Sequence, residues 1–163
     1  MITNFENLPR LREEYSDSIA FCSGCFDLLH TGHLEGLEFA RSQASLLVVG
    51  IQPDVRTREM KGPSRPIQAE TSRMMLINSL RIVGYTFLMP PRRSDITPTM
   101  RVLKALQPDV FVIHEENATP WTFEDIESLR NMGTEFVVDH AAKRDSTSAI
   151  IGRIITLHGQ KDS

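Results

Sequence analysis

The chain has 163 residues, of which 40% are hydrophobic and 24% are charged, and its formal net charge is −3 at pH 7. This length suits one domain with one well-buried core, and the composition is that of a folded globular protein rather than a disordered one. The small negative charge provides no global positive field. We therefore expect no nucleic acid and no membrane surface among its partners.

The N-terminal stretch up to Tyr15 is polar and charged, so it lacks the apolar segment of a secretory signal. The apolar runs of the chain are far shorter than the roughly 20 residues that cross a bilayer. Cys22 and Cys25 are the only cysteines, so there is no disulfide framework. These features predict a cytoplasmic protein.

Short β-rich runs alternate with stretches of helical periodicity along the chain. Residues 1–18 are predicted to form an N-terminal extension with one short helix, residues 19–157 the domain itself, and residues 158–163 a frayed tail. Strands are expected, in order, at Ile19–Ser23, Leu46–Ile51, Tyr85–Met89, Val110–His114 and Glu135–Val138. Helices are expected at Gly32–Gln43, Ala69–Arg81, Thr97–Leu106 and Thr122–Met132, with a last helix after Ser146.

This alternation predicts an α/β fold, a Rossmann-like doubly wound parallel sheet of about five strands with helices on both faces. Ligands of such sheets bind beyond the carboxyl ends of the strands. The candidate ligand-binding loops are therefore those at that edge: Gly24–Thr31, Gln52–Pro66, Pro90–Ile96, Glu115–Pro120 and Asp139–Ser146.

The first of these loops carries His30, and His33 follows three residues later in the first turn of the predicted helix. At this spacing both rings can face the same side of the helix. Backbone N–H groups at a helix N-terminus favour phosphate, and Gly32 leaves room for a ligand to approach closely. The residues alone also allow a helix cap, a surface position or a zinc site without a third ligand in view.

The spacing C-x-x-C of Cys22 and Cys25 has three interpretations. Zinc normally needs four ligands, and no second pair at metal spacing follows. A redox dithiol would need a lowered thiol pKa. The position of Cys22 in an apolar strand favours simple packing in the core.

The run from Gly24 to His33, G-C-F-D-L-L-H-T-G-H, resembles the G-x-F-D-x-x-H-x-G-H motif of the cytidylyltransferase-like nucleotidyltransferases. That family includes cytidylyltransferases for glycerol, choline and ethanolamine phosphates, archaeal FAD synthases and the adenylyltransferase domain of ADP-heptose synthase. Every fixed position of the motif is matched. The resemblance implies that His30 and His33 act on the reacting phosphate, and that the nucleotide is bound by Gly24, Cys25, Phe26, Asp27 and Gly32.

Further segments extend the resemblance over roughly residues 19–157. Lys61 to Ile67, K-G-P-S-R-P-I, is similar to a K-G-x-x-R-P segment of the ADP-heptose synthase type, which implies a catalytic Lys61 on the NTP phosphates and Arg65 near the acceptor substrate. Asp54 falls where relatives carry an Asp after the second strand and is likewise assigned to substrate binding. Arg73 matches the Arg of an E-x-R-M pattern, although Thr71 replaces its Glu, and the resemblance assigns Arg73 to nucleotide binding.

The run from Lys143 to Ile151, K-R-D-S-T-S-A-I-I, resembles the family's ending, in which hydroxyl groups and backbone contact the triphosphate. Arg144, Ser146 and Thr147 are therefore expected at the nucleotide, although a plain N-cap explains Ser146 or Thr147 equally well. Relatives carry glycines and an Asp in the base pocket after the fourth strand. This chain has His114, Glu115, Glu116 and Asn117 there, and we expect His114, Glu115 and Asn117 to line the pocket.

The resemblance implies a nucleotidyltransferase that moves a nucleoside monophosphate from an NTP, ATP or CTP, to a small phosphorylated substrate. Adenylyl transfer to a sugar or polyol phosphate is favoured. Transfer of cytidylyl to glycerol, choline or ethanolamine phosphate, and FAD synthesis, are alternatives. A nucleotide-binding regulator without turnover is an alternative of another class. Mg²⁺ is expected to arrive with the NTP, with no metal ligands from the protein, and a homodimer is expected from the family.

Overall fold

The computed structural model describes residues 1–94, 96–117, 121–141 and 145–159. Five strands form its sheet: β1 Ile19–Gly24, β2 Leu46–Ile51, β3 Tyr85–Leu88, β4 Val110–His114 and β5 Glu135–Asp139. The α-helices are α1 Leu8–Glu14, α2 Thr31–Ser42, α3 Asp54–Lys61, α4 Glu70–Asn78, α5 Pro98–Leu106, α6 Phe123–Asn131 and α7 Thr147–His158. Short 3-10 turns lie at Phe5–Asn7 (η1) and Glu115–Asn117 (η2). In these ranges no helix is both long and apolar enough to cross a bilayer.

All strand pairs are parallel, and the strand order is β3-β2-β1-β4-β5. The chain thus adds β2 and then β3 on one side of β1, crosses back, and adds β4 and then β5 on the other side. The turning point falls between β1 and β4, next to the segment that joins β1 to α2 and leads to His30 and His33. The predicted Rossmann-like α/β fold is confirmed. The predicted and observed boundaries of each strand differ by at most one residue.

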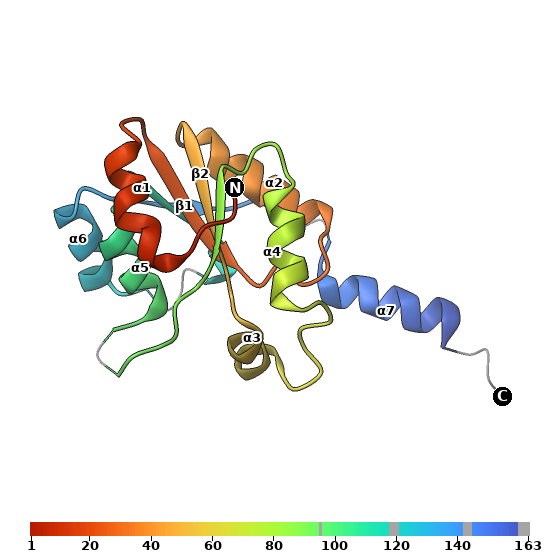
Figure 1. Ribbon diagram of the computed structural model, residues 1–163. Helices are drawn as coiled ribbons and strands as arrows, with labels where there is room; N and C mark the ends of the chain where they lie inside the picture. Colours follow the sequence, from red (N-terminus) through yellow and green to blue (C-terminus); the bar gives the residue numbers. More distant parts are fainter. Residues whose placement is uncertain (95, 118–120, 142–144, 160–163) are drawn as a thin grey trace.

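Helices cover both faces of the sheet (Figure 1). On one face, side chains of α1, α5 and α6 pack with the sheet residues Ile19, Phe21, Val48, Phe87 and Phe111. On the other face, α2 and α4 pack on alternate sheet residues, among them Ala20, Leu47, Val49 and Val112. The side chains of a strand alternate between faces, so a strand buried on both faces must be apolar throughout. The β2 sequence L-L-V-V-G-I meets this requirement, and all six residues are buried.

The N-terminal residues pack against the rest of the domain. Ile2 forms a parallel bridge with Thr86 of β3, and the Thr3 N–H donates to the Thr86 carbonyl at 2.8 Å. Leu8 and Leu11 of α1 are buried in the first core cluster. This segment therefore covers part of the outer edge of β3, which would otherwise expose unpaired backbone groups.

Helix α3 was not expected, because residues 52–66 were predicted to be a loop. The helix D-V-R-T-R-E-M-K has no apolar stripe, since Val55 and Met60 are both exposed. It has no side-chain cap of its own at Pro53, and the carboxylate of Glu70 in α4 accepts the Asp54 N–H at 2.7 Å instead. Tertiary contacts, which a periodicity search does not see, therefore hold this helix.

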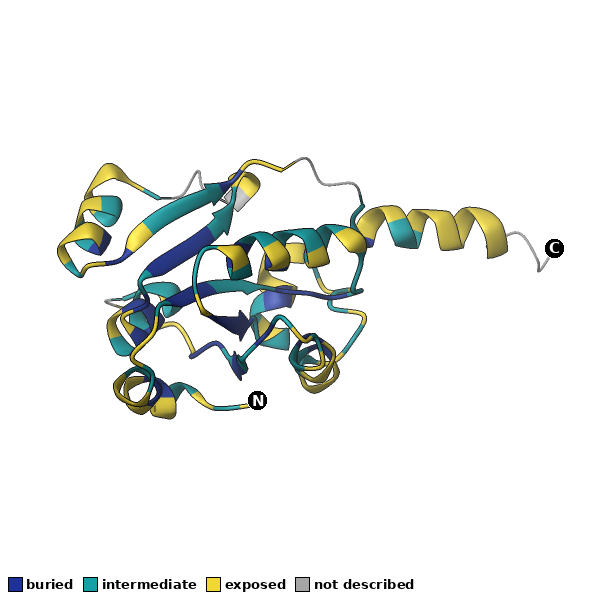
Figure 2. Cartoon of the chain, turned by 90° about the horizontal axis from the view of Figure 1, so that it is seen from above, coloured by how far each residue is buried: buried dark blue, intermediate teal, exposed yellow. Residues whose placement is uncertain are grey.

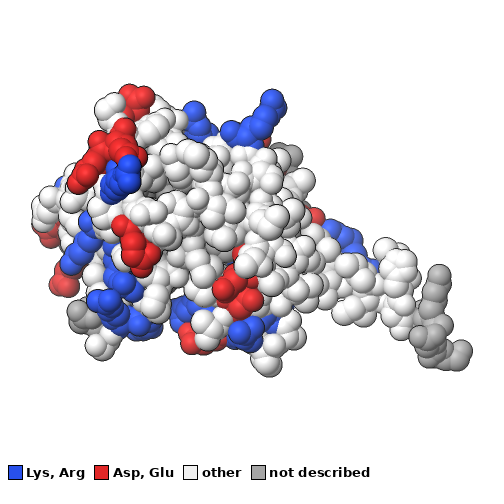
Figure 3. Space-filling model, viewed as in Figure 1, with Lys and Arg blue, Asp and Glu red and all other residues white. Residues whose placement is uncertain are grey.

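Helix α7 extends away from the body of the molecule (Figures 1 and 2). Its first residue, Thr147, is buried, whereas Ile154, Ile155 and Leu157 are exposed. Arg153 is the only Lys, Arg, Asp or Glu in the helix, so its outer part is largely uncharged (Figure 3).

Candidate active site

Buried polar side chains gather beyond the carboxyl ends of the strands. Seven polar or charged residues are buried in the described part of the chain. Five of them lie at this edge: Asp27, Thr57, Arg73, Asp139 and Thr147. Burying such groups costs free energy unless they are hydrogen-bonded, so their concentration at one edge marks a built polar site.

The turn after β1 is shaped around the ring of Phe26. Phe26 has a φ of 48°, in the left-handed region that side chains rarely adopt. A Cβ atom at Gly24 would lie 2.9 Å from this ring, so only glycine fits there. The ring meets His33 edge-on, with the centroids 5.2 Å apart. Gly24 and Phe26 therefore shape the turn and support His33.

His30 is the N-cap of α2. Its Nδ1 accepts the backbone N–H of His33 at 3.3 Å, so the ring proton of the neutral imidazole is on Nε2. The rings of His30 and His33 are stacked, with the centroids 3.7 Å apart and the planes 21° apart. The cap therefore fixes the orientation and the tautomer of the His30 ring.

The start of α7 lies against the start of α2. A Cβ atom at Gly32 would be 3.2 Å from the Asp145 carbonyl oxygen and 3.2 Å from His30 Nδ1. Ser146 is the N-cap of α7, and its Oγ accepts the Ala149 N–H at 3.1 Å. The predicted positions Gly32, Ser146 and Thr147 are therefore brought together, and two helix N-termini converge on one place.

Asp145 holds this junction through its side chain. Arg153 donates to both carboxylate oxygens, at 3.1 and 2.9 Å, and the Ser146 N–H donates to Oδ1 at 2.9 Å. The hydrogen bond from Arg153 is the largest cause of a lowered pKa of Asp145, followed by the bond from Ser146. The carboxylate therefore stays ionised and connects the segment before α7 to the second turn of the helix.

Arg73 lies beneath the site, with its side chain fully buried. Its Nε donates to the Gln68 carbonyl at 3.0 Å and its Nη1 to the Cys25 carbonyl. Its Nη2 donates to the Gln52 carbonyl at 2.8 Å and to Asp54 at 2.7 Å. All three nitrogens bind protein atoms, so Arg73 fixes the turn after β1, the end of β2 and the start of α3 relative to one another. Contact of Arg73 with the nucleotide stays a prediction.

Lys61 and Asp54 are the last and first residues of α3, which follows β2 (Figure 1). Asp54 pairs with Arg73, and Lys61 is exposed. Lys61 was expected in a loop, and its place on a helix corrects that expectation. Gly62 follows with a φ of 95° and ends the helix.

Asp27 connects the turn after β1 to the segment after α3. Its Oδ1 accepts the N–H groups of Ile67 and Gln68, at 2.8 and 3.0 Å. Its Oδ2 accepts Arg65 Nε at 2.5 Å, and the side chains of Arg65 and Asp27 are 11% and 1% exposed. The predicted substrate residue Arg65 is thus held directly beside the predicted nucleotide loop.

The loop after β4 makes its contacts with the end of β5. His114 Nδ1 accepts the Glu116 N–H at 3.3 Å, so its Nε2 donates to the Ala141 carbonyl at 3.0 Å. Glu115 lies 3.3 Å from His140 Nδ1, with both side chains exposed. Neither residue has a described contact with His30 or His33. Arg144 and the side chain of Asn117 lie outside the described residues.

The thiols of the C-x-x-C pair are not arranged for redox chemistry. Cys22 packs against the second core cluster, and burial raises the pKa of its thiol to about 12. Cys25 is buried, and its sulfur accepts the Thr57 hydroxyl at 3.6 Å. Among the described residues no group of three or more His, Cys, Asp or Glu could hold a metal ion. Packing in the core is the interpretation that this geometry supports.

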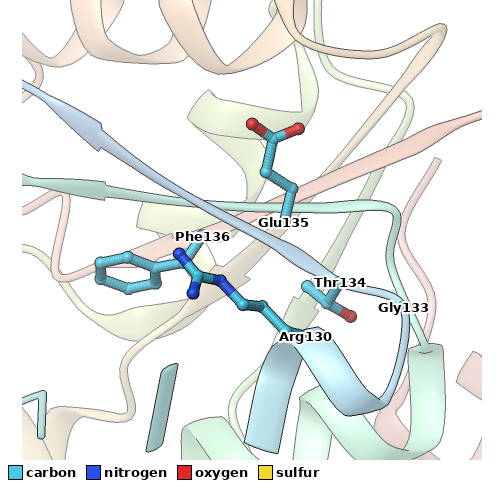
Figure 4. A pocket seen from close by; sticks show the side chains of 5 residues that line it. All are labelled: Arg130, Gly133, Thr134, Glu135 and Phe136. Atoms are coloured by element: carbon cyan, nitrogen blue, oxygen red, sulfur yellow. The ribbon is translucent and has the colours of Figure 1, made fainter. Parts of the chain in front are cut away.

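Two surface hollows differ in their relation to this site. The hollow in Figure 4, about 400 Å³, is lined by Arg130, Gly133, Thr134, Glu135 and Phe136. These residues lead into β5 at its amino end, so this hollow lies at the edge of the sheet opposite the histidines. The other, about 410 Å³, borders the carboxyl end of β3 and includes Leu88, Met89, Arg93 and Arg101.

Three residues that support the site were not singled out from the sequence. The carboxylate of Glu70 caps α3, and that of Asp145 accepts hydrogen bonds from Arg153 in α7. The carbonyl of Gln68 accepts Arg73 Nε, and its N–H donates to Asp27. The position of Asp145 directly before the N-cap was the only local signal for any of them. The contacts of Glu70 and Gln68 join residues 16 and 41 positions apart, which no short motif reports.

Comparison with known proteins decides the family. The cytidylyltransferase-like family model matches residues 21–153, most of the chain and the whole site described above. The chain belongs to the cytidylyltransferase-like family. The resemblance expected from the motif is therefore confirmed, and the family is one of nucleotidyltransferases.

Several curated relatives of this cytidylyltransferase-like chain carry the name bifunctional protein HldE. The relative from Syntrophotalea carbinolica is 31% identical over 166 residues, covering 96% of this chain and 33% of the relative. That from Azorhizobium caulinodans is 34% identical over 138 residues, covering 85% and 28%. The chain therefore spans about a third of the length of these relatives.

Solved structures agree on the fold. A lipopolysaccharide core biosynthesis protein from Thermoplasma volcanium aligns with a TM-score of 0.62 and 24% identity, covering 80% of this chain and all of that one. Pantoate-beta-alanine ligase from Francisella tularensis aligns with a TM-score of 0.63 and 15% identity, covering 88% of this chain and 68% of that one.

Proposed function

We propose that this chain transfers a nucleoside monophosphate from an NTP to a sugar or polyol phosphate and releases pyrophosphate. The observation that carries the proposal is the junction of α2 and α7. Two helix N-termini meet at Gly32 and Asp145, with the stacked His30 and His33 on the same turn. Such a junction favours an anionic group, and two adjacent helix N-termini suit the several charges of a polyphosphate.

In the proposed reaction an oxygen of the acceptor phosphate attacks the α-phosphorus of the NTP. The new P–O bond forms as the bond to the bridging oxygen breaks, and pyrophosphate leaves with that electron pair. A phosphate monoester is largely a dianion at neutral pH, so the step needs no general base. Catalysis then consists of positioning and of stabilising the developing charge.

Each site element has a role in this scheme. The Nε2–H of His30 and the ring of His33 donate to the α-phosphate and the bridging oxygen, where charge develops. Ser146 keeps its hydroxyl hydrogen for a phosphate oxygen, and Thr147 adds a second hydroxyl at the start of α7. Lys61, at the end of α3, neutralises the phosphates. Mg²⁺ enters as part of the NTP, bound mainly by phosphate and water.

The choice of acceptor follows from the segment after α3. The run K-G-P-S-R-P-I resembles the ADP-heptose synthase type, and the curated relatives named HldE match the same region. Both favour adenylyl transfer to a sugar phosphate over cytidylyl transfer to a smaller alcohol phosphate. The homodimer and the cytoplasmic location stay predictions.

The proposal is tested by measuring pyrophosphate release with ATP and with CTP against a panel of phosphorylated acceptors. The panel contains sugar 1-phosphates, glycerol 3-phosphate, choline phosphate and ethanolamine phosphate. We expect acceptor-dependent release with ATP and a sugar 1-phosphate. Nucleotide binding without release for any acceptor would instead identify a regulator.

A further inference from the structure

Two arginines flank the turn after β1 and use their nitrogens differently. A guanidinium has five N–H donors. Arg73 is fully buried and engages Nε, Nη1 and Nη2 with protein oxygens. The side chain of Arg65 makes one hydrogen bond within the described residues, from Nε to Asp27, so no partner is described for its two terminal nitrogens. Arg73 therefore has a structural role, whereas the terminal N–H groups of Arg65 can donate to a ligand.

Asp27 holds Arg65 in a fixed direction. The carboxylate is itself immobilised, because Oδ1 accepts the N–H groups of Ile67 and Gln68 while Oδ2 accepts Arg65 Nε. A planar guanidinium bonded through Nε points its opposite, two-nitrogen edge away from the carboxylate. Asp27 therefore sets where that edge lies, at the cost of burying its own charge.

The position of this pair separates it from the triphosphate contacts. Residues 65–68 follow β2 and α3, whereas the start of α7 follows β5, and both adjoin the turn between β1 and α2. In-line displacement requires the attacking and leaving oxygens on opposite sides of the α-phosphorus. If the leaving pyrophosphate lies toward α7, the attacking phosphate approaches from the side of Arg65.

We propose that Asp27 is a positioning residue that aims the guanidinium of Arg65 at the phosphate group of the acceptor. The identity of that phosphate rests on the function proposed above, whereas the existence of a phosphate site at Arg65 does not. Asp27 contacts no substrate in this scheme and acts only through Arg65 and the segment Ile67–Gln68.

Asp27→Asn tests the proposal with minimal disturbance. The amide oxygen of Asn can still accept the N–H groups of Ile67 and Gln68, but its NH₂ group faces Arg65 Nε with a donor. Arg65→Lys keeps the positive charge and removes the fork. Asp109→Asn is a matched control, because Asp109 also pairs with an arginine, Arg12, and accepts a backbone N–H, that of Ile19, at the opposite edge of the sheet.

The first measurement is a titration with inorganic phosphate followed by ¹H–¹⁵N NMR. The amides of Ile67 and Gln68 and the Arg65 Nε–H report this site, and the Gly32 amide reports the α2–α7 junction. We expect saturable shifts at residues 65–68 in the wild type and an affinity there about 10-fold weaker in Asp27→Asn, with Gly32 unchanged. Absence of saturable shifts in the wild type, or equal or tighter binding in Asp27→Asn, would overturn the proposal.

The second measurement uses turnover with the acceptor found by the panel. Asp27→Asn should raise the acceptor KM by about 10-fold and change the NTP KM by less than about 2-fold, and it should add little in an Arg65→Lys background. A merely structural role would raise both KM values and lower the Tm. If no acceptor reacts while the NMR result holds, the proposed function fails and the phosphate site at Arg65 stands.

Discussion

His30 has two tasks in the proposed scheme. Its Nδ1 caps α2 by accepting the His33 N–H, which places the ring proton on Nε2. In the proposed reaction this Nε2–H donates to the α-phosphate. A residue that served only as a cap would be replaceable by Asn or Ser. A residue that donates to the α-phosphate would not, so the two tasks are separable by substitution.

We predict that His33→Ala and His30→Asn each lower kcat by about 100-fold or more, since each removes one preorganised donor. Asn at position 30 retains a capping oxygen, so the melting temperature should change little. Steady-state pyrophosphate release measures the effect. His158→Ala, at the far end of α7, is the control and should retain full turnover. A wild-type kcat in His33→Ala would contradict the proposed catalytic role of the histidines.

Burial of the Cys22 thiol predicts a pH-dependent stability. The thiol has its ordinary pKa of 9.0 in the unfolded chain, and burial raises the pKa in the folded protein to about 12. The protonated thiol is therefore favoured in the folded state, and this contribution is complete below about pH 9 and is lost as the pH rises toward about 12.

Urea unfolding of the wild type and of Cys22→Ala at about pH 8 and about pH 10 checks this prediction. The stability difference between the two proteins should fall by ~1 kcal/mol over that interval. Because Cys22→Ala lacks only this thiol, titration of other groups cancels in the comparison. A difference that stays constant with pH would show that the thiol is accessible to water.

At the scale of elements, the contact between the starts of α2 and α7 depends on Gly32. An added Cβ there would lie 3.2 Å from the Asp145 carbonyl and from His30 Nδ1, which is tighter than ordinary contact. Both neighbours must move, and both belong to the proposed phosphate site.

We predict that Gly32→Ala lowers kcat/KM by about 10-fold or more while the protein still folds, because a small misplacement of reacting groups is costly. Gly36→Ala on the same helix is the matched control, since its Cβ would make only ordinary contact, 3.6 Å from Asp139. That control should stabilise the protein by about 0.5–1 kcal/mol and keep its activity. Equal activity of the two variants would contradict the proposed role of the junction.

Helix α3 shows why part of the fold was not predictable from the sequence. The strands were found because buried parallel strands are continuous apolar runs, and α5 was found because Val102, Leu103 and Leu106 form one buried face. Helix α3 has no such face, and it depends on Glu70 and Arg73 from a later helix. Lys61 was therefore predicted to be a site residue but was assigned to a loop.

The dependence of α3 on Glu70 is itself testable. Glu70→Ala removes the acceptor for the Asp54 N–H, so we expect a loss of about 1 kcal/mol in the free energy of unfolding and a KM for the NTP about 3-fold higher, as Lys61 loses its fixed place. Glu59→Ala removes an exposed pair with Arg56 on the same helix and should have little effect. Denaturant unfolding and steady-state kinetics compare the two. Equal effects would mean that Glu70 is not the cap.

For the molecule as a whole, the motif predicted where the chemistry lies but not how the site is supported. The turn of His30 and His33 and the segment of Ser146 and Thr147 were placed at one edge by the rule for parallel sheets, and the fold brings them into contact. Asp27 and Arg65 were assigned to nucleotide and substrate separately. Their ion pair spans 38 residues and follows only from the fold.

The most direct test of the central claim follows the label of the NTP. The protein is incubated with the accepted sugar phosphate and ATP labelled at either the α- or the γ-phosphate. We predict that the α-label enters the organic product and the γ-label is found in pyrophosphate, and that His33→Ala loses both together. Transfer of the γ-label to the acceptor, or release of the γ-label as inorganic phosphate, would contradict nucleotidyl transfer at this site.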